Sequence, residues 1–253
     1  MRPQEYETMF HAEEVHWWYK ALHRLIFITL DEQLPAWREK DILDAGCGTG
    51  AILHRLGNAE KHRGLDIAEE AISFCRQRGL RNVREGDICE LPFPDECFDA
   101  AICSSVLYHQ WVRDIDLALS ELRRVLRPGG ILLVNLPAYD FLASAHDEAV
   151  MTARRFRKRE VQSLLAENGF AVRSVNYWTA LLFPAAVIAR TLHASQTGRD
   201  FGAAAPRRGL LDGLFSFAMR AELPLMKRFS LPFGVAIFAI ATKPHSQSRG
   251  AVT

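Results

Sequence analysis

Short apolar runs alternate with amphipathic segments along most of the chain. Strand-like runs occupy residues 41–46, 62–67, 82–88, 98–106, 131–137, 171–178 and 234–243. The run at 98–106 is continuously apolar, which is typical of a strand buried in a parallel sheet. Helical spacing of apolar residues favours helices at 68–79, 114–130 and 158–170, and the glycine-rich turn of 128–130 stops the second. This alternation predicts an α/β fold with right-handed crossovers and helices on both faces of a mostly parallel sheet.

The two ends and one internal segment depart from this rhythm. The apolar spacing of the first forty residues predicts helix, with Pro35 at its exit. Residues 179–232 hold apolar stretches around a loop-like, partly basic piece, and a segment of that length favours a cap over a linker. We therefore expect a helical lid (1–38), a core (39–178), an apolar helical cap (179–232), a final core strand (233–243) and a polar, disordered tail (244–253).

Composition narrows the class of protein without naming a chemistry. The chain has 253 residues, 49% hydrophobic and 24% charged, with a net charge of +1, so no global attraction to nucleic acid is expected. Five cysteines without a C-x-x-C pair indicate reduced thiols rather than disulfides or a zinc site. The acidic, polar N-terminus does not resemble a signal peptide, and no apolar run approaches the length of a membrane span. We expect a cytoplasmic protein with no metal.

The sharpest motif is the glycine-rich turn DAGCGTG, Asp44–Gly50, between a predicted strand and a predicted helix. Glycines there allow a tight turn and close approach of the backbone to a ligand. Gly46, Gly48 and Ala51 also satisfy the G-x-G-x-x-G/A dinucleotide fingerprint. The glycines alone therefore leave nicotinamide nucleotides, S-adenosylmethionine and a purely structural turn as alternatives.

Acidic residues end three successive predicted strands. Asp44 precedes the turn, where its carboxylate can meet the ammonium group of an amino-acid-bearing cofactor. Asp66 is placed to accept hydrogen bonds from ribose hydroxyls. Asp87 and Ile88 are placed beside the amino group and the face of an adenine. Each aspartate has a plainer interpretation as a turn or helix cap, but caps explain the set of three less well.

Taken together, these motifs resemble those of the class I S-adenosylmethionine-dependent methyltransferases. DAGCGTG, LDI, GD followed by LPFPDECFD, and RVLRPGG before ILLVNLP carry the resemblance, which is strong over 41–178. It implies a Rossmann-like, seven-stranded, mostly parallel sheet whose last strand is antiparallel. It also implies that the cofactor contacts Asp44, Gly46, Gly48, Asp66, Ile67, Asp87, Ile88 and Ser104.

The ends of the chain resemble a bacterial subgroup of small-molecule or lipid type with a type 11/12-like methyltransferase domain. EEVHWWYKALHRLI, the stretch from HDEAV to AENGF, and LPFG carry this second likeness. It implies a lid helix over the cofactor, with Trp17, Trp18, Tyr19 and Arg24 as lid candidates and Trp18 and Arg24 as cofactor contacts. Plain core packing is the alternative for the aromatic residues.

Two histidines are candidates for acid–base catalysis. His109 follows the fourth core strand, and His146 follows the fifth, beside Asp147, which is placed to orient an imidazole. Base catalysis is not obligatory, because a sulfonium is already activated and alignment is the main task. The basic run at 154–159 favours a solvated face, with contact to an anionic acceptor as the alternative.

The function predicted is methyl transfer from S-adenosylmethionine to a small-molecule or lipid-linked acceptor, which the sequence does not identify. A nicotinamide-dependent oxidoreductase and a non-catalytic cofactor-binding module are the alternatives. The apolar cap at 179–232 favours a hydrophobic acceptor, peripheral contact with a membrane, or a homodimer interface. No nucleic-acid partner is expected.

Overall fold

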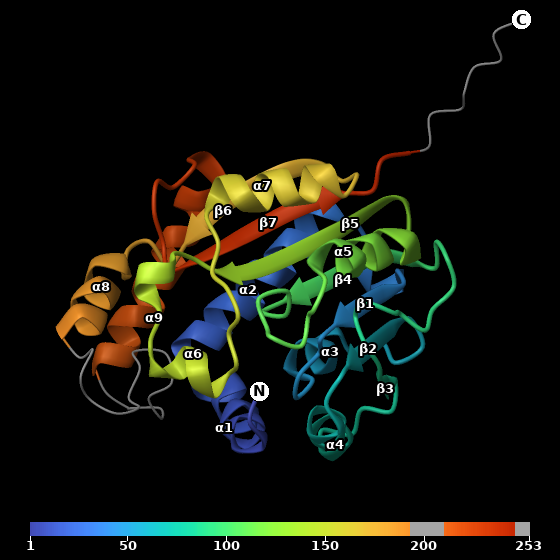
Figure 1. The fold of residues 1–253 in the computed structure, drawn as a ribbon, viewed down its shortest axis with the longest axis horizontal. Coiled ribbons are helices and arrows are strands. Elements are labelled where there is room, and N and C mark those ends of the chain that lie inside the picture. Colours follow the sequence, from blue (N-terminus) through green and yellow to red (C-terminus); the bar gives the residue numbers. More distant parts are fainter. Residues whose placement is uncertain (193–209, 246–253) are drawn as a thin grey trace, which may run out of the picture.

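A seven-stranded sheet forms the centre of the computed structural model, which describes residues 1–192 and 210–245 (Figure 1). The strands are β1 (Ile42–Ala45), β2 (His62–Asp66), β3 (Val83–Glu85), β4 (Phe98–Ser104), β5 (Leu126–Pro137), β6 (Ala171–Trp178) and β7 (Ala236–Thr242). Their order is β3-β2-β1-β4-β5-β7-β6. Only β7 runs antiparallel to its neighbours, between β5 and β6. The predicted Rossmann-like fold class is confirmed.

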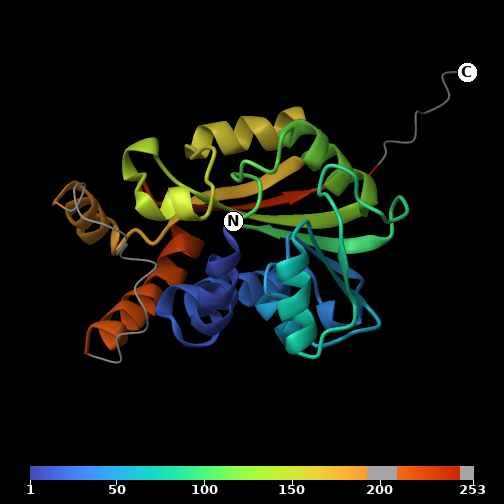
Figure 2. The ribbon, with the colours of Figure 1, turned by 60° about the horizontal axis from the view of Figure 1, so that its bottom comes forward.

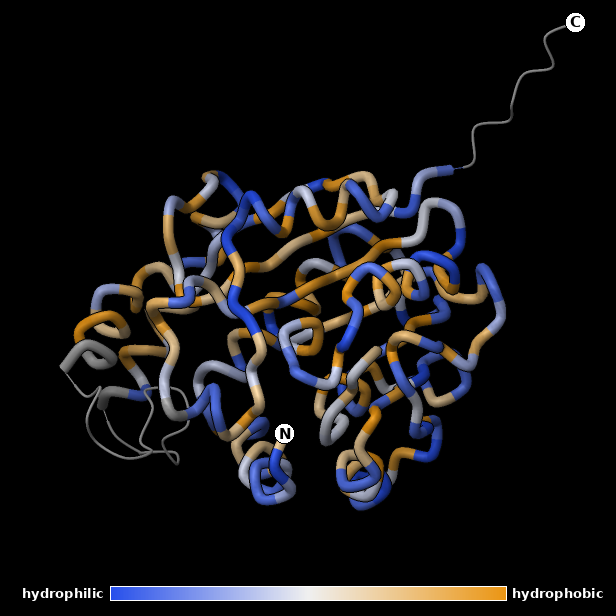
Figure 3. Tube along the Cα trace, viewed as in Figure 1, coloured by the Kyte–Doolittle hydropathy of each residue, from blue (hydrophilic) through white to orange (hydrophobic). Residues whose placement is uncertain are grey.

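Helices cover both faces of the sheet. They are α1 (Pro3–Val15), α2 (Trp17–Gln33), α3 (Ala51–Leu56), α4 (Glu69–Gln77), α5 (Ile115–Val125), α6 (Ala145–Ala149), α7 (Lys158–Glu167), α8 (Phe183–Leu192) and α9 (Leu210–Arg228), with 3-10 turns η1 (Trp37–Glu39) and η2 (Asp140–Leu142). Apolar residues of α5 and α7 share one core cluster, and those of α2, α3 and α9 share the other. Figure 2 shows these two layers above and below the sheet. In Figure 3 hydrophobic positions concentrate along the central strands, as burial on both faces requires.

The N-terminal segment is two helices rather than one. His16 separates them with extended backbone (φ −72°, ψ 134°), and its side chain accepts a hydrogen bond from the backbone N–H of Trp18. An acceptor at that position caps the second helix, which is why the chain restarts there. α2 packs into the core, whereas α1 lies against α3 and α4 (Figure 1).

The helix predicted over 114–130 ends earlier than expected. α5 stops at Val125, and β5 begins at Leu126, so the turn Pro128–Gly130 belongs to the strand. The residue before a proline is pushed out of the helical region, which favours extended backbone ahead of Pro128. The proline and glycines therefore mark the start of a strand rather than the last turn of a helix.

The predicted cap is described in part. α8 and α9 lie within it, and α9 packs its buried Met219 and Leu223 into the core cluster that contains α2. Glu222 of α9, itself buried, accepts a hydrogen bond from the backbone N–H of Leu181 (2.9 Å), which fastens the start of α8 to α9. Residues 193–209 of the cap and 246–253 of the tail lie outside the described residues.

Candidate functional site

A cavity of about 450 Å³ follows the carboxyl ends of the strands, where ligands bind in open α/β sheets. Its walls come from α1 and α2, the turn after β1, the ends of β2 and β4, the segments after β3, β5 and β6, and α8. The predicted site residues on its wall are Trp18, Gly46, Gly48, Asp66, Ile67, Asp87, Ile88, Ser104, His109 and His146. The structure thus brings together residues that the sequence places as far as 128 positions apart.

The glycine turn is a close-fitting cradle in which side chains have no room. Gly46 has φ +80°, and a Cβ there would lie 2.2 Å from a methyl group of Val106. Gly48 has φ +53°, and a Cβ there would lie 2.8 Å from the methyl group of Met9 on α1. Both backbones adopt the left-handed region that favours glycine. The turn therefore presents bare backbone to the cavity, as the motif predicts.

Asp66 is bound to the glycine turn and to the backbone of Ala68, just before α4. One carboxylate oxygen accepts the N–H of Gly48 (2.9 Å), and the other accepts the N–H of Ala68 (3.0 Å). A carboxylate has about four acceptor positions, so these two bonds leave room for two more. Asp87 likewise accepts the N–H of Cys89 (2.8 Å) through one oxygen. Asp87 therefore closes a local turn, whereas Asp66 does not cap α4, whose N-cap is Ala68 without a side-chain hydrogen bond; both aspartates face the cavity.

Asp44 does not line the cavity but lies buried at the end of β1, just before the turn. Only 1% of the residue is exposed, and Oδ2 has no hydrogen-bond partner in the described part of the chain. Burial, followed by the charges of Glu13 and Asp66, raises the pKa of Asp44 to about 8. A cation that approaches the turn would stabilise the ionised form of this buried carboxyl group.

A buried ion pair holds α1 over the part of the cavity beside the glycine turn. Arg78, which follows α4, donates to Glu13 of α1 (2.8 Å), and both side chains are 8% exposed. The guanidinium also donates to the carbonyl oxygen of Thr49 (2.8 Å) and to that of Phe10 (3.1 Å). Its carbon lies 4.3 Å from the centre of the Phe10 ring. One side chain thus joins α1, α4 and the glycine turn.

Sequence reasoning missed Glu13 and Arg78. Burial raises the pKa of Glu13 to about 7, although Thr49 and Arg78 both donate hydrogen bonds to it. A signal existed for Glu13, because it follows Tyr6 and Met9 at helical spacing on the face of α1 that lines the cavity. Arg78 had no signal beyond its place before the predicted helix-ending Gly79.

The lid candidates divide into two groups. Trp17, Trp18 and Tyr19 line the cavity, and the two tryptophans also pack in the core, with ring centres 5.4 Å from Phe215 and 5.6 Å from Trp178 respectively. The two tryptophans therefore both pack in the core and line the cavity. Arg24 is exposed on α2 and does not line the cavity.

Beyond β4 the cavity holds a few polar groups among apolar walls. His109 has a buried Nδ1 with no hydrogen-bond partner in the described residues. Burial, followed by the charge of the N-terminal ammonium, lowers the pKa of His109 to about 4, so the imidazole is neutral at pH 7. Thr179, 2% exposed and with φ +61°, has a buried hydroxyl that also lacks a described partner. Such strain in a β-branched residue is uncommon and concentrates at functional sites.

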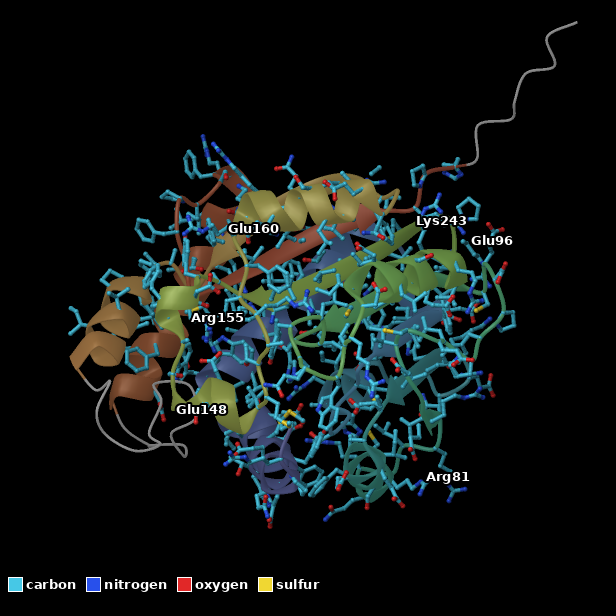
Figure 4. The ribbon with its side chains drawn as sticks, viewed as in Figure 1. Arg81, Glu96, Glu148, Arg155, Glu160 and Lys243 are labelled. Carbon is cyan, nitrogen blue, oxygen red and sulfur yellow. The ribbon has the colours of Figure 1, made fainter. Side chains whose placement is uncertain are left out.

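The second candidate histidine lies beside an ion pair. His146 lines the cavity from α6, and its neighbour Asp147 binds Arg155 through both oxygens (2.7 and 2.8 Å). The Arg155 side chain is 6% exposed, and it also donates to the carbonyl oxygen of Ala138 (3.0 Å). The basic run is therefore divided: Arg155 is buried (labelled in Figure 4), whereas Arg154, Arg157 and Arg159 are exposed.

Known proteins with similar sequences are methyltransferases. A family model described as a methyltransferase domain matches residues 43–134. The chain is 32% identical over 194 residues to a malonyl-[acyl-carrier protein] O-methyltransferase of Erwinia pyrifoliae, covering 74% of this chain and 70% of that protein. It is 38% identical over 151 residues to a fatty-acid O-methyltransferase of Mycolicibacterium smegmatis, covering 54% and 53%. For the first three curated relatives, the match spans 62%, 39% and 53% of the relative's length.

Solved structures share the fold. A methyltransferase from Thermotoga maritima gives a TM-score of 0.59 at 23% identity and covers 95% of each chain. A [4+2]-cyclase gives 0.56 at 22% identity, covering 90% of this chain and 83% of that one. Because the same fold also serves a cyclase, these likenesses show the fold alone. Among residues 1–192 and 210–245 there is no metal-binding cluster of acidic, cysteine and histidine side chains, and no helix long and apolar enough to cross a bilayer.

Proposed function

Because this chain belongs to the S-adenosylmethionine-dependent methyltransferases, we propose that it transfers a methyl group from that cofactor to a small-molecule or lipid-linked acceptor. The observation that carries the proposal is one continuous cavity with two halves. One half has a glycine cradle and strand-end carboxylates, and the other has mostly apolar walls. A nicotinamide-dependent oxidoreductase is not favoured, since the relatives that match are methyltransferases.

The residues present fit S-adenosylmethionine. The cradle at Gly46 and Gly48 leaves space that a Cβ would fill, and the orphaned oxygen of Asp44 lies just beneath it. We assign Asp44 the cofactor's positive charge, Asp66 the ribose hydroxyls, and Asp87 with Ile88 the adenine. Ile67 and Ser104 complete this wall, and Trp18 covers it from α2. When bound, the cofactor supplies a methyl group on a positively charged sulfur.

The walls of the second half favour an acceptor with a hydrocarbon chain. Trp17, Leu182, Ala186 and Val235 line it, so that apolar atoms of an acceptor would leave water on binding. O-methyltransferases similar to this chain are named for a fatty acid and for a malonyl group on a carrier protein. Both names support an oxygen atom of an acyl-type molecule as the methyl acceptor.

His109 is our candidate general base. Its imidazole is neutral at pH 7 and lies on the cavity wall, so we assign it the proton of an acceptor hydroxyl as that oxygen is methylated. A carboxylate acceptor has no proton to lose and would not need this step. His146 is the second candidate, on the α6 side of the same cavity. The chain's remaining task is alignment, because a methyl group on sulfur needs in-line attack more than activation.

Transfer of labelled methyl groups to palmitic acid and to hexadecanol tests this function. We expect label in the methyl ester of the acid. His109→Gln should leave that rate within about twofold and lower any rate on the alcohol by about 10²–10⁴-fold, as for loss of a general base. His54→Gln, an exposed histidine of α3, is the matched control. Binding of cofactor without label in any acceptor would favour the non-catalytic binding module.

The pH dependence of cofactor binding tests the role of Asp44. Its pKa of about 8 in the free protein means that it is mostly protonated at pH 7. A cation nearby favours the carboxylate, so binding should release about one proton below pH 8. Affinity should therefore rise as the pH rises towards 8 and level off above it. Calorimetry in buffers of different ionisation enthalpy measures the released proton, and Asp44→Asn should abolish the release; an unchanged release in Asp44→Asn would assign it to another group.

A further inference from the structure

Four aromatic side chains from separate parts of the sequence meet at the start of α8. Tyr139, Phe141 of η2, Phe183 of α8 and Phe233 before β7 form this aromatic patch. Ring centres lie 5.2 Å apart for Tyr139 and Phe141, 5.8 Å for Tyr139 and Phe183, and 5.1 Å for Phe183 and Phe233. Phe141 is 60% exposed and Phe233 is 41% exposed. Clustered apolar exposure of this kind marks an interaction surface.

The backbone of Tyr139, which joins the patch to the core, is strained. Tyr139 has φ +54°, a conformation that side chains with a Cβ rarely adopt. Its N–H donates to the carbonyl oxygen of Phe156 (3.1 Å), and its ring stacks on Tyr177 of β6 with centres 5.1 Å apart. The surrounding structure thus fixes the Tyr139 ring, against which Phe141 and Phe183 pack.

Cationic residues border the patch. The side chain of Lys158 donates to Ser230, three residues before Phe233, and its backbone N–H donates to the Tyr177 hydroxyl (3.2 Å). The charge of Arg157 acts on the Tyr139 hydroxyl. Asp140, exposed beside Phe141, and Glu160, whose carboxylate accepts the backbone N–H of Arg157 (2.7 Å), are acidic residues at the same border. The excess of positive charge therefore comes from the wider segment that contains the patch.

Positively and negatively charged residues are unevenly divided along the chain. Of 31 Lys and Arg residues, 15 lie in residues 151–253, whereas only 5 of the 30 Asp and Glu residues lie there. A nearly neutral protein thus has a strongly basic segment, coloured yellow to red in Figure 1, which contains α7, α8 and α9. Two copies meeting through this segment would bring like charges together, which disfavours a homodimer at the aromatic patch.

We propose that the aromatic patch and its basic border bind the surface of an anionic phospholipid membrane. Exposed aromatic side chains enter the interfacial region of a bilayer, while Lys and Arg pair with anionic headgroups. Leu182, just before α8, and Ala186 of the same helix line the cavity. An apolar acceptor would then pass from the bilayer to the cavity beneath α8; this route, unlike the binding itself, rests on the proposed function.

Sedimentation of the full chain with vesicles tests the proposal. We expect binding to phosphatidylcholine vesicles containing phosphatidylglycerol and weak binding to phosphatidylcholine alone. Arg157→Gln should weaken binding to the anionic vesicles by about fivefold, the contribution of one cation at such a surface. Combining Phe141→Ser with Phe233→Ser should weaken it by at least about tenfold, since two aromatic side chains no longer enter the interface.

Matched controls lie elsewhere on the surface. Arg81→Gln, an exposed cation beside β3 that Figure 4 labels away from α8, and Leu117→Ser, an exposed leucine of α5, should leave vesicle binding unchanged. Equal binding to both kinds of vesicle, binding to neither, or equal loss in the controls would overturn the proposal. So would concentration-dependent self-association that the Phe141→Ser and Phe233→Ser changes abolish. Vesicle binding needs no cofactor or acceptor, so it can succeed where methyl transfer fails, and the reverse.

Discussion

Asp66→Ala should lower the affinity for S-adenosylmethionine by at least about a hundredfold. Two hydrogen bonds from ribose hydroxyls to a carboxylate are lost, and bonds to charged groups contribute about 1.5–3 kcal/mol each. The geometry supports this assignment, because Asp66 ends β2 on the cavity wall and already binds the N–H of Gly48. Calorimetric titration of the purified variant with the cofactor measures the effect.

The same substitution also removes hydrogen bonds within the protein, so the experiment needs a control for folding. Loss of the bond to Ala68 should cost about 1.5–3 kcal/mol of stability, as expected for a hydrogen bond to a charged group. Thermal unfolding of the variant therefore accompanies the titration. Asp116→Ala, an exposed carboxylate of α5, should bind the cofactor normally. Unchanged affinity in folded Asp66→Ala would overturn the ribose assignment.

The sheet was predictable because its signals are local and repeated. β1, β4 and β5 contain short apolar runs, and each is followed by a turn or a helix with its own pattern. The antiparallel position of β7 has no such signal, since the run at 234–243 reads the same in either direction. Family resemblance supplied that direction.

The glycine turn and the strand-end acids were predictable for a related reason. Parallel strands place all their carboxyl ends at one edge, so Asp66 and Asp87 face the cavity on topology alone. The position of Asp44 was less predictable, because the depth of a residue below a turn depends on the packing around it. The same limit applies to Arg24, whose spacing fits a lid but whose side chain faces solvent.

Contacts between distant segments were beyond local pattern. Arg78 and Glu13 are 65 positions apart, and only the break at His16 allows α1 to lie against α4. The imidazole of His16 accepts the N–H of Trp18 and so starts the second helix. The helical spacing of apolar residues continues on both sides of this point and gives no sign of the break. The lid was thus predicted as a helix over the cofactor, while the side chain that fastens it was not.

Arg78→Met should destabilise the protein by about 3–5 kcal/mol, the cost of leaving one partner of a buried ion pair uncompensated. Glu13 would then be buried against Thr49 with no cation beside it. The loss should depend on pH. The pKa of Glu13 in the folded protein is already about 7, above the unfolded value of 4.5, and loss of the Arg78 guanidinium raises it further. The stability of Arg78→Met therefore falls as the pH rises from about 5 to above 7, as the unfolded carboxyl gives up its proton first.

A double variant separates charge from packing. Glu13→Gln removes the charge that Arg78 neutralises, so Arg78→Met combined with Glu13→Gln should be more stable at pH 8 than Arg78→Met alone. Urea unfolding at pH 5.5 and at pH 8 measures all three variants, and Arg76→Met, the preceding arginine of α4, which is exposed, is the control. A pH-independent loss in Arg78→Met, unrelieved by Glu13→Gln, would mean that Arg78 stabilises α1 through its contacts with Phe10 and the Thr49 carbonyl rather than through the ion pair.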